Sequence, residues 1–185
     1  MKVFEKFHKS TFIKEWDKNE PSPRKFTVLY KGYPRLPAIK LPAVKKLHVP
    51  LGQALTKRHS FREFNTNQHL TSVQISTLLN YSVGLKKNRN LSESRFYPSA
   101  GARYPIETYL FIRDTHYLEP ALYHYYLRTH CLEKLYSYEE ASLLDCFSQR
   151  WVKKAHGLIV LTALFDRNTV KYGNRGYRHV LAEAG

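Results

Sequence analysis

Lys171 and Tyr172 are neighbours, and two glycines follow them within the next four residues. An ammonium group close to a phenol lowers the pKa of the phenol, and burial lowers the pKa of an amine, so such a pair is suited to proton transfer. The glycines predict a tight turn before a helix that begins near Tyr177. A surface turn that carries Lys and Tyr incidentally is the alternative interpretation.

A second set of polar residues alternates along the chain at Arg58, Ser60 and Arg62. Alternate side chains of an extended segment share one face, so the two guanidinium groups and the hydroxyl are expected to lie together. Such a set suits a phosphate group, because guanidinium groups match the geometry of phosphate oxygens. An exposed basic strand without a ligand is the alternative interpretation.

The segment from Arg95 to Pro105 contains two prolines and a run of small residues, Ser99 to Ala102. The prolines exclude a helix interior or a central strand, so we predict a loop. A backbone with almost no side chains lets a flat ligand approach closely, and its N–H groups can bind an anion. The loop leads into Ile106–Arg113, whose β-branched and aromatic residues predict a strand. A plain connection between two elements is the alternative.

The chain is strongly basic, with a formal net charge of +15 over 185 residues, a length sufficient for one domain with a sizeable core. Residues 1–60 hold 14 Lys and Arg against 4 Asp and Glu, so the charge is concentrated there. This asymmetry indicates an anionic partner, either a cofactor phosphate, an acidic peptide or a nucleic acid, and a basic soluble surface is the alternative. We expect no nucleic-acid partner, because the sequence has no helix-turn-helix, zinc-finger or RNP-like motif.

Other classes of protein are disfavoured by the sequence. Cys131 and Cys146 lack CxxC spacing, so we expect no disulfide framework and a reducing, cytoplasmic location. The nine histidines form no HxxxH or HExxH pair, and His124, His130 and Cys131 alone are a weak zinc signal, so we predict no metal site. We expect no signal peptide, because charged residues interrupt the first ten positions. The longest apolar run, Gly157–Phe165, is too short to span a membrane.

Hydrophobic spacing, capping residues and turn signals predict the order of the elements. The predicted helices are Phe4–Asp17, Pro50–Arg58, Thr71 or Ser72 to Val83 with a stop at Gly84, Tyr138–Phe147, Ser148–Ala155 and a last helix from near Tyr177. The predicted strands are Ile106–Arg113, a hairpin of Ala121–Tyr126 and His130–Leu135, and a buried strand, Gly157–Phe165. Six prolines between positions 21 and 50, with apolar residues among them, predict a basic extension over residues 1–49 that wraps on a domain of residues 50–185.

Three motifs occur in an order and spacing that resemble the nitroreductase superfamily: RHSFREF at 58–64, PSAGARYP at 98–105 and KYGNRGYR at 171–178. Within that superfamily the sequence is similar to the SagB-type dehydrogenases, which form thiazoles and oxazoles. The segment Phe7–Ser10 and the proline-rich stretch before Leu41 also resemble that branch. Each motif is weak alone, whereas the ordered set is specific and covers roughly residues 7–185.

The resemblance implies an α+β fold, a nitroreductase-like three-layer sandwich in which helices flank a mainly antiparallel sheet. It also implies an intertwined homodimer with FMN at the dimer interface. The implied contacts to the FMN phosphate and ribityl chain come from Arg58, His59, Ser60 and Arg62. The implied lining of the flavin, from the same chain or from the partner subunit, comes from Pro98, Ser99, Ala100 and Gly101.

The implied reaction is the oxidation of a thiazoline or oxazoline in a modified ribosomal peptide to the azole, with Lys171 and Tyr172 as the catalytic pair. FMN provides the oxidising chemistry, so the protein must remove a carbon-bound proton. The implied partners are the precursor peptide and a second copy or other peptide-modifying proteins, with no membrane. A generic NAD(P)H-dependent nitroreductase-like flavoprotein and a non-catalytic peptide-docking or complex partner are the alternatives, and the Lys-Tyr pair argues mildly against the former.

Members of this family continue beyond the helix that begins near Tyr177, whereas this sequence reaches Ala184 and Gly185. We therefore expect a fold that is incomplete at its C-terminus, as in a truncated or split gene product. The part expected to be missing contains the rest of a central helix, at least one strand, a further basic contact to the FMN phosphate and the dimer-swapping tail. An interrupted core helix leaves apolar surface and a sheet edge exposed.

Overall fold

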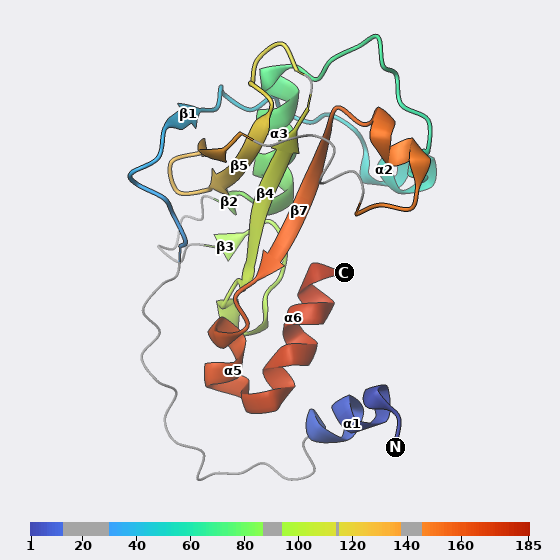
Figure 1. Ribbon diagram of the computed structural model, residues 1–185, viewed down its shortest axis with the longest axis vertical. Helices are drawn as coiled ribbons and strands as arrows, with labels where there is room; N and C mark the ends of the chain where they lie inside the picture. Colours follow the sequence, from blue (N-terminus) through green and yellow to red (C-terminus); the bar gives the residue numbers. More distant parts are fainter. Residues whose placement is uncertain (13–29, 87–93, 114, 138–145) are drawn as a thin grey trace.

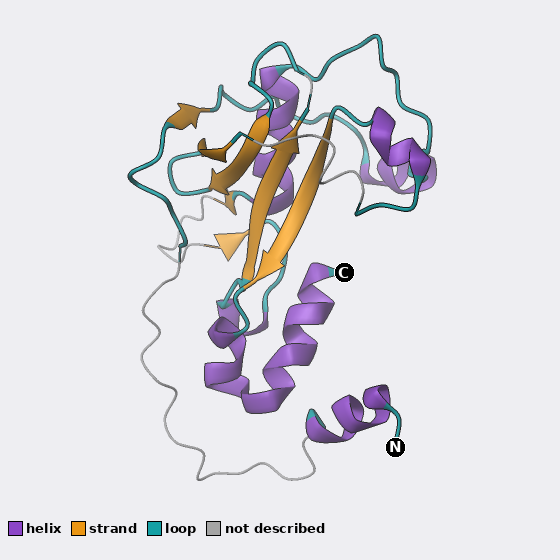
Figure 2. Ribbon diagram, viewed as in Figure 1, coloured by secondary structure: helices purple, strands orange, loops and turns teal. Residues whose placement is uncertain are grey.

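The computed structural model describes residues 1–12, 30–86, 94–113, 115–137 and 146–185, in which helices flank an antiparallel sheet (Figure 1 and Figure 2). The helices are α1 (Val3–Ser10), α2 (Leu51–Lys57), α3 (Ser72–Val83), α5 (Asp166–Tyr172) and α6 (Gly176–Ala184), with short 3-10 helices at Ala100–Ala102, Arg150–Lys154 and Gly173–Arg175. The strands are β1 (Ala38–Lys40), β2 (Leu85–Lys86), β3 (Ser94–Arg95), β4 (Ile106–Ile112), β5 (Ala121–Tyr126), β6 (Cys131–Tyr136) and β7 (Gly157–Ala163). The predicted α+β class is confirmed.

The main sheet has the strand order β1-β6-β5-β4-β7, and every neighbouring pair in it is antiparallel. On β4, Tyr109 lies opposite His124 of β5 on one side and Val160 of β7 on the other. The predicted hairpin forms β5 and β6, and His130 before β6 has a left-handed φ of 52°. The strand that follows the small-residue loop, β4, therefore lies inside the sheet.

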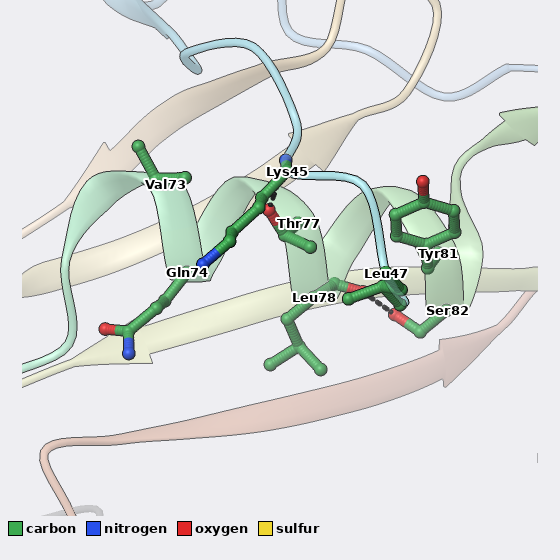
Figure 3. A pocket seen from close by; sticks show the side chains of 8 residues that line it. All are labelled: Lys45, Leu47, Val73, Gln74, Thr77, Leu78, Tyr81 and Ser82. Atoms are coloured by element: carbon green, nitrogen blue, oxygen red, sulfur yellow. Dashed lines mark hydrogen bonds between the residues drawn. The ribbon is translucent and has the colours of Figure 1, made fainter. Parts of the chain in front are cut away.

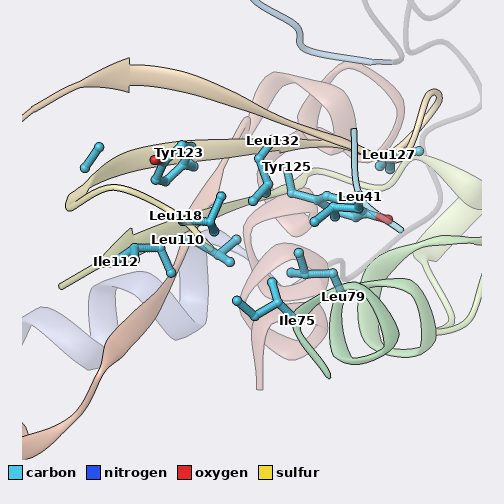
Figure 4. Close-up of a cluster of buried hydrophobic side chains, with 11 residues drawn as sticks. Leu41, Ile75, Leu79, Leu110, Ile112, Leu118, Tyr123, Tyr125, Leu127 and Leu132 are labelled. Carbon is cyan, nitrogen blue, oxygen red and sulfur yellow. The ribbon is translucent and has the colours of Figure 1, made fainter. Parts of the chain in front are cut away.

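One face of the sheet packs against α3 and forms the hydrophobic core (Figure 4). Leu110 and Ile112 of β4 share this buried cluster with Ile75 and Leu79 of α3. The complete cluster is Leu41, Ile75, Leu79, Leu110, Ile112, Leu118, Ala121, Tyr123, Tyr125, Leu127 and Leu132. Period-2 alternation along the strands and the helical spacing on α3 bring these side chains to one interface.

α3 begins and ends at the predicted residues. Thr71 is its N-cap, and its hydroxyl oxygen accepts from the Gln74 N–H at 3.2 Å, while the Gln74 side chain accepts from the Thr71 N–H at 2.8 Å. This reciprocal pair satisfies two backbone donors at the start of the helix. Gly84 closes the helix, and its N–H donates to the Asn80 carbonyl at 3.0 Å.

The opposite face of the sheet is more polar. It carries Glu107, Tyr109, His124 and Glu133 on β4, β5 and β6. Lys31 and Tyr33 lie over this face: Lys31 Nζ donates to the Tyr109 hydroxyl at 2.7 Å, and the Tyr33 N–H donates to Glu133 Oε1 at 2.9 Å. The sheet thus has one face built for packing and one that carries hydrogen bonds and charges.

The prediction of a buried strand over Gly157–Phe165 is wrong. The strand is present as β7, but among the described strands it pairs only with β4 and forms an edge of the sheet. Ile159 is 50 % exposed and Leu161 is 45 % exposed. A continuous apolar run indicates a strand, but it carries no information on where that strand lies in the sheet order.

Residues 166–172 form a helix, α5, that the sequence analysis does not predict. Its sequence, DRNTVKY, contains Asp, Asn, Thr and Val, which are weak helix formers, and has no apolar stripe. The next helix begins at Gly176, one residue before its predicted start at Tyr177. The predicted helix over Ser148–Ala155 is reduced to the 3-10 helix Arg150–Lys154.

Two other helix predictions are tested only in part. The first described helix, α1, ends at Ser10, and the later part of the predicted Phe4–Asp17 lies outside the described residues. Most of the predicted Tyr138–Phe147 also lies outside them. The second helix is confirmed as α2, with Pro50 at its N-cap.

α5 and α6 lie at the end of the sheet where β4 begins and β7 ends, whereas α2 lies near the other end (Figure 1). Arg178 of α6 joins α1 to the first of these ends. Its Nη2 donates to the His8 carbonyl at 2.7 Å, and its Nε donates to the Thr11 hydroxyl at 2.6 Å. The guanidinium therefore satisfies a carbonyl in the last turn of α1.

In the part of the chain that the structure describes, no helix has the length and apolar character needed to cross a membrane. The same residues contain no cluster of three His, Cys, Asp or Glu side chains that could hold a metal ion. Cys131 is buried and Cys146 is exposed, and no disulfide joins them.

The packing of α3 gives the first testable prediction. Leu79 is 1 % exposed inside the core, so Leu79→Ala should lower the free energy of unfolding by about 2–5 kcal/mol. Its neighbour Leu78 is 52 % exposed, so Leu78→Ala is a matched control with a much smaller effect. Urea denaturation of both variants measures the difference, and equal losses would contradict the assigned orientation of α3.

Candidate active site

Residues 98–104 form a tight loop with three left-handed backbone positions: Gly101 has φ 61°, Ala102 has φ 53° and Tyr104 has φ 46°. Glycine adopts this conformation at little cost, whereas the other two are strained. The Ser99 hydroxyl oxygen accepts from the Tyr104 N–H at 2.8 Å, and the Ser99 carbonyl accepts from the Ala102 N–H at 3.1 Å. Such strain persists only where the surrounding structure holds it, which is common at ligand-binding loops.

Two buried arginines hold the flanks of this loop. Arg95 Nη1 donates to the Tyr97 hydroxyl at 2.9 Å and to the Ile106 carbonyl at 3.0 Å. Arg167 Nη1, from α5, donates to the Tyr104 carbonyl at 2.6 Å. The Arg167 bond connects the loop directly to the helix that ends in Lys171 and Tyr172.

The side chains of Lys171 and Tyr172 converge on Gly101. A Cβ atom added to Gly101 would come within 2.9 Å of Lys171 Nζ and would collide with the Tyr172 hydroxyl. Neighbours on a helix point about 100° apart rather than in opposite directions, which is how the last turn of α5 brings both to one point. Lys171 is exposed and Tyr172 is half-buried, and Gly173 with φ 53° ends the helix directly after them.

A chain of buried polar contacts crosses the polar face of the sheet behind this site. Arg167 Nη2 lies 2.5 Å from Glu107 Oε1, His124 Nε2 lies 3.3 Å from Glu107 Oε2, and His124 Nδ1 lies 2.8 Å from Glu133 Oε2. Burial alone would raise the pKa of Glu107, but the His124 hydrogen bond and the Arg167 charge outweigh it and lower that pKa. The network therefore joins α5 to three neighbouring strands.

A cavity of about 710 Å³ lies beside residues 98–100 of the loop, and Gly101, Lys171 and Tyr172 are not among the residues that line it. Its lining includes Pro98, Ser99 and Ala100, apolar groups from β4, β7 and α3, and two titratable residues of α6, His179 and Glu183. This volume is in the range of small-molecule and cofactor sites, which combine apolar walls with a few polar groups. Three of the four residues predicted to line a flavin thus share one cavity.

The two titratable residues that α6 contributes to the cavity, His179 and Glu183, are one helical turn apart. The ring of His179 lies 4.8 Å from the ring of Tyr172, and burial, followed by the Arg175 charge, lowers the pKa of His179. Burial raises the pKa of Glu183, although its hydrogen bond from Ser99 opposes the shift. Both shifts favour the neutral form of the side chain.

The predicted phosphate-binding residues lie elsewhere in the chain. Arg58, His59, Ser60 and Arg62 are exposed in the segment that follows α2. The rings of His59 and Phe61 are 3.9 Å apart, as expected for alternate side chains of an extended segment. None of these four predicted residues is among those that line the cavity.

A different cavity, of about 510 Å³, lies on the outer side of α3 (Figure 3). Val73, Leu78 and Tyr81 of α3 line it, together with Leu47 from the preceding segment, whose Lys45 N–H donates to the Thr77 hydroxyl at 2.9 Å. Its walls are mostly apolar and hold no acid–base pair, so it offers less chemistry than the cavity beside residues 98–101.

Three residues of the site carry no recognisable motif in the sequence: Arg167, His179 and Glu183. The partner of Arg167, Glu107, is 60 positions earlier in the chain, and the partner of Glu183, Ser99, is 84 positions earlier. The one available signal is the spacing of His179 and Glu183, which places them on one face of the predicted last helix.

The sequence comparison identifies the family to which this fold belongs. Residues 55–185 match the nitroreductase family, and the chain belongs to that family. Members of this family typically use flavin cofactors, so the chain is a nitroreductase-like oxidoreductase by descent.

Two named proteins are similar to this chain in sequence. A Methanocaldococcus jannaschii protein named as a nitroreductase, MJ1384, is 31 % identical over 149 residues, which is 80 % of this chain and 72 % of that protein. The microcin B17-processing protein McbC of Escherichia coli is 34 % identical over 101 residues, which is 51 % of this chain and 37 % of McbC.

Solved structures agree with the fold. A protein from Anabaena variabilis described as a nitroreductase has a TM-score of 0.67 and 27 % identity, over 97 % of this chain and 35 % of that one. A counterpart from Ralstonia eutropha has a TM-score of 0.64 and 28 % identity, over 89 % and 74 % of the two chains. The E. coli microcin synthetase McbBCD complex, with truncated pro-MccB17 bound, has a TM-score of 0.53 and 21 % identity over 99 % of this chain and 73 % of that one, which shows a shared fold.

The buried ion pair gives the second prediction. Glu107→Gln leaves the Arg167 guanidinium buried without its charge partner, so the free energy of unfolding should fall by about 3–5 kcal/mol at neutral pH. Because the folded protein lowers the pKa of Glu107, this stabilisation is present above the ordinary Glu range and is lost as the pH falls through the lowered pKa.

Urea denaturation at neutral and acidic pH measures this effect. Glu119→Gln is the control, because Glu119 is 78 % exposed and its ion pair with Lys134 lies at the surface, so its loss should change stability little. A Glu107→Gln variant as stable as wild type at neutral pH would show that the ion pair does not hold α5 to the sheet.

Proposed function

We propose that this chain is an FMN-dependent oxidoreductase that oxidises thiazoline or oxazoline rings in a ribosomal peptide to azoles. The observation that carries the proposal is the convergence of Lys171 and Tyr172 on Gly101, at the loop whose small residues line the main cavity. An acid–base pair held against a backbone with almost no side chains is what a proton transfer beside a flat cofactor requires.

The residues of this loop fit a flavin. Pro98, Ser99 and Ala100 leave the backbone accessible at the cavity, and apolar groups from β4 and β7 provide a wall for an aromatic ring system. When bound there, FMN would supply the two-electron oxidation that no side chain can perform. The chain itself would bind the ring, exclude water and handle the proton.

Azoline oxidation removes two hydrogens from the ring. One carbon-bound hydrogen leaves as a proton, and the other leaves together with two electrons. We assign the proton to the Tyr172 hydroxyl oxygen, and we assign Lys171 as the cation that stabilises negative charge on that oxygen, although the two roles are interchangeable in this geometry. Lys171 Nζ lies 5.3 Å from the centre of the Tyr172 ring, so the charge is close to the phenol.

The choice of a peptide azoline as substrate is supported by McbC, which is named as a microcin B17-processing protein. The fold shared with the McbBCD complex supports a working form in which this chain assembles with peptide-modifying partners or with a second copy. The net charge of +15 suits an acidic peptide or a phosphate-bearing cofactor.

A second copy is also the simplest source of the phosphate contacts. Arg58, His59, Ser60 and Arg62 are exposed and do not line the cavity of their own chain. We propose that they complete the FMN site across a homodimer interface, where exposed guanidinium groups would gain a doubly charged ligand. Binding and dimerisation would then be linked, because the ligand contacts both chains.

A generic NAD(P)H-dependent nitroreductase activity is the second candidate. It is favoured by the similarity to MJ1384, which extends over more of this chain than the similarity to McbC. Consumption of NADPH with a nitroaromatic acceptor, without turnover of an azoline peptide, would select this candidate over the first.

The phosphate assignment gives the third prediction. Arg58→Ala should weaken FMN binding about ten- to a hundredfold, since it removes a charge-assisted contact of about 1.5–3 kcal/mol. Lys134→Ala changes the net charge equally but lies on β6, so it should bind FMN like wild type. Flavin fluorescence titration compares the two, and equal affinities would reject Arg58 as a phosphate ligand.

The catalytic assignment gives the fourth prediction. Tyr172→Phe should slow azoline oxidation by about 10²–10⁴-fold while FMN remains bound, because the ring is retained and only the hydroxyl is lost. Lys171→Ala should also slow the reaction. The absorbance of the azole formed from a thiazoline-containing peptide reports the rate, and the flavin spectrum reports occupancy.

The controls for this experiment separate chemistry from folding. Tyr177→Phe removes a hydroxyl from an exposed residue of α6 and should leave the rate unchanged. Wild-type rates in both the Tyr172→Phe and Lys171→Ala variants would refute the catalytic pair. A flavin-loaded wild-type protein without azoline oxidation would refute the proposed substrate and favour a non-catalytic partner or the nitroreductase alternative.

A further inference from the structure

Glu183 in the last turn of α6 reaches back to the loop that lines the cavity. The Ser99 hydroxyl donates to Glu183 Oε2 at 2.5 Å, while the same hydroxyl oxygen accepts from the Tyr104 N–H at 2.8 Å. A hydroxyl group has a single proton, so these two bonds fix the rotation of the Ser99 side chain. The loop is therefore held at two points, by Arg167 of α5 at the Tyr104 carbonyl and by Glu183 of α6 at Ser99.

The second oxygen of this carboxyl group, Oε1, is buried and has no hydrogen-bond partner among the described residues. Glu183 lines the cavity of about 710 Å³. A buried carboxyl oxygen without a partner is costly, so a group that fills the cavity and donates a hydrogen bond would relieve that cost. Ile106 and Leu161 form part of the apolar wall of the same cavity, and their side chains have no hydrogen-bond donor.

We propose that Glu183 is a positioning residue that acts through Ser99 on the ligand held against residues 98–101. Its Oε2 accepts from the serine hydroxyl and so orients the loop that faces that ligand. This inference rests on the proposed function, in which that ligand is a flavin. It assigns a role to a residue outside the Lys171–Tyr172 pair.

The surroundings of Glu183 determine when it ionises. The charged and titratable groups that face it are Arg95, Arg167, Tyr97 and His179. Burial raises the pKa of Glu183 and outweighs the opposing effects of the Ser99 hydrogen bond and of the two arginines. The ionised carboxylate holds the Ser99 hydroxyl by a charge-assisted bond, so flavin affinity should increase as the pH rises through this raised pKa.

FMN titration of the full chain, followed by flavin fluorescence over a series of pH values, tests the inference. Glu183→Gln keeps the shape of the side chain but cannot ionise, so it should bind FMN about tenfold more weakly above the raised pKa and should lose the increase with pH. In a Ser99→Ala background the same substitution should have no further effect, because the double-mutant cycle isolates an action through Ser99.

Two controls assign the pH response to this residue. His179→Gln removes the other titratable group of α6 in the cavity and should retain the increase in affinity with pH. Glu119→Gln removes an exposed carboxylate outside the cavity and should match wild type throughout. Loss of the pH response in His179→Gln, together with its retention in Glu183→Gln, would overturn the inference.

Unfolding measurements without ligand separate a role in binding from a role in folding. Because the folded state raises the pKa of Glu183, wild type should lose stability relative to Glu183→Gln as the pH rises through that pKa. Two results would overturn this inference and leave the proposed function intact. One is that Glu183→Gln binds flavin as tightly as wild type, and the other is that the substitution has the same effect with and without Ser99. A wild-type chain that binds no flavin at any pH would overturn the proposed function and this inference with it.

Discussion

The buried guanidinium of Arg167 is the constraint on which the rest of the site depends. A charge that is fully removed from water needs partners, and Arg167 has two on other elements, Glu107 of β4 and the Tyr104 carbonyl of the loop. Its Nε has no hydrogen-bond partner among the described residues, so the site depends on these two contacts. These contacts fix α5, the sheet and the loop relative to one another. Because α5 ends in Lys171 and Tyr172, satisfying this one charge also sets the position of both side chains beside Gly101.

The two faces of the sheet divide stability and chemistry between them. On one face, Leu110 and Ile112 pack against α3 in an apolar cluster that needs no specific polar geometry (Figure 4). On the other face, the chain from Glu107 through His124 to Glu133 stabilises the fold only when every member has its partner. A conservative change is therefore tolerated better on the first face than on the second, although both are equally buried.

Local signals in the sequence predict the elements that depend on local interactions. The Thr71–Gln74 capping box and Gly84 define α3, and the small residues with two prolines define the loop. α5 is not predictable in this way, since its residues are weak helix formers and the helix is held by contacts of Arg167 with distant residues. The same holds for the edge position of β7 and for the Ser99–Glu183 bond, because strand order and partners 84 residues apart leave no local pattern.

The two edge strands of the sheet differ in how readily a further strand can pair with them. β1 pairs over three residues only and ends in Lys40, whereas β7 is seven residues long and exposes Ile159 and Leu161. Short edges and lysines discourage the addition of another strand, and long apolar edges favour it. In the described part of the chain, a further strand could form backbone hydrogen bonds along the whole of β7 and cover its apolar side chains. The same strand could form few such bonds at β1. Self-association in concentrated solution should therefore be one-sided, with β7 as the surface at which it starts.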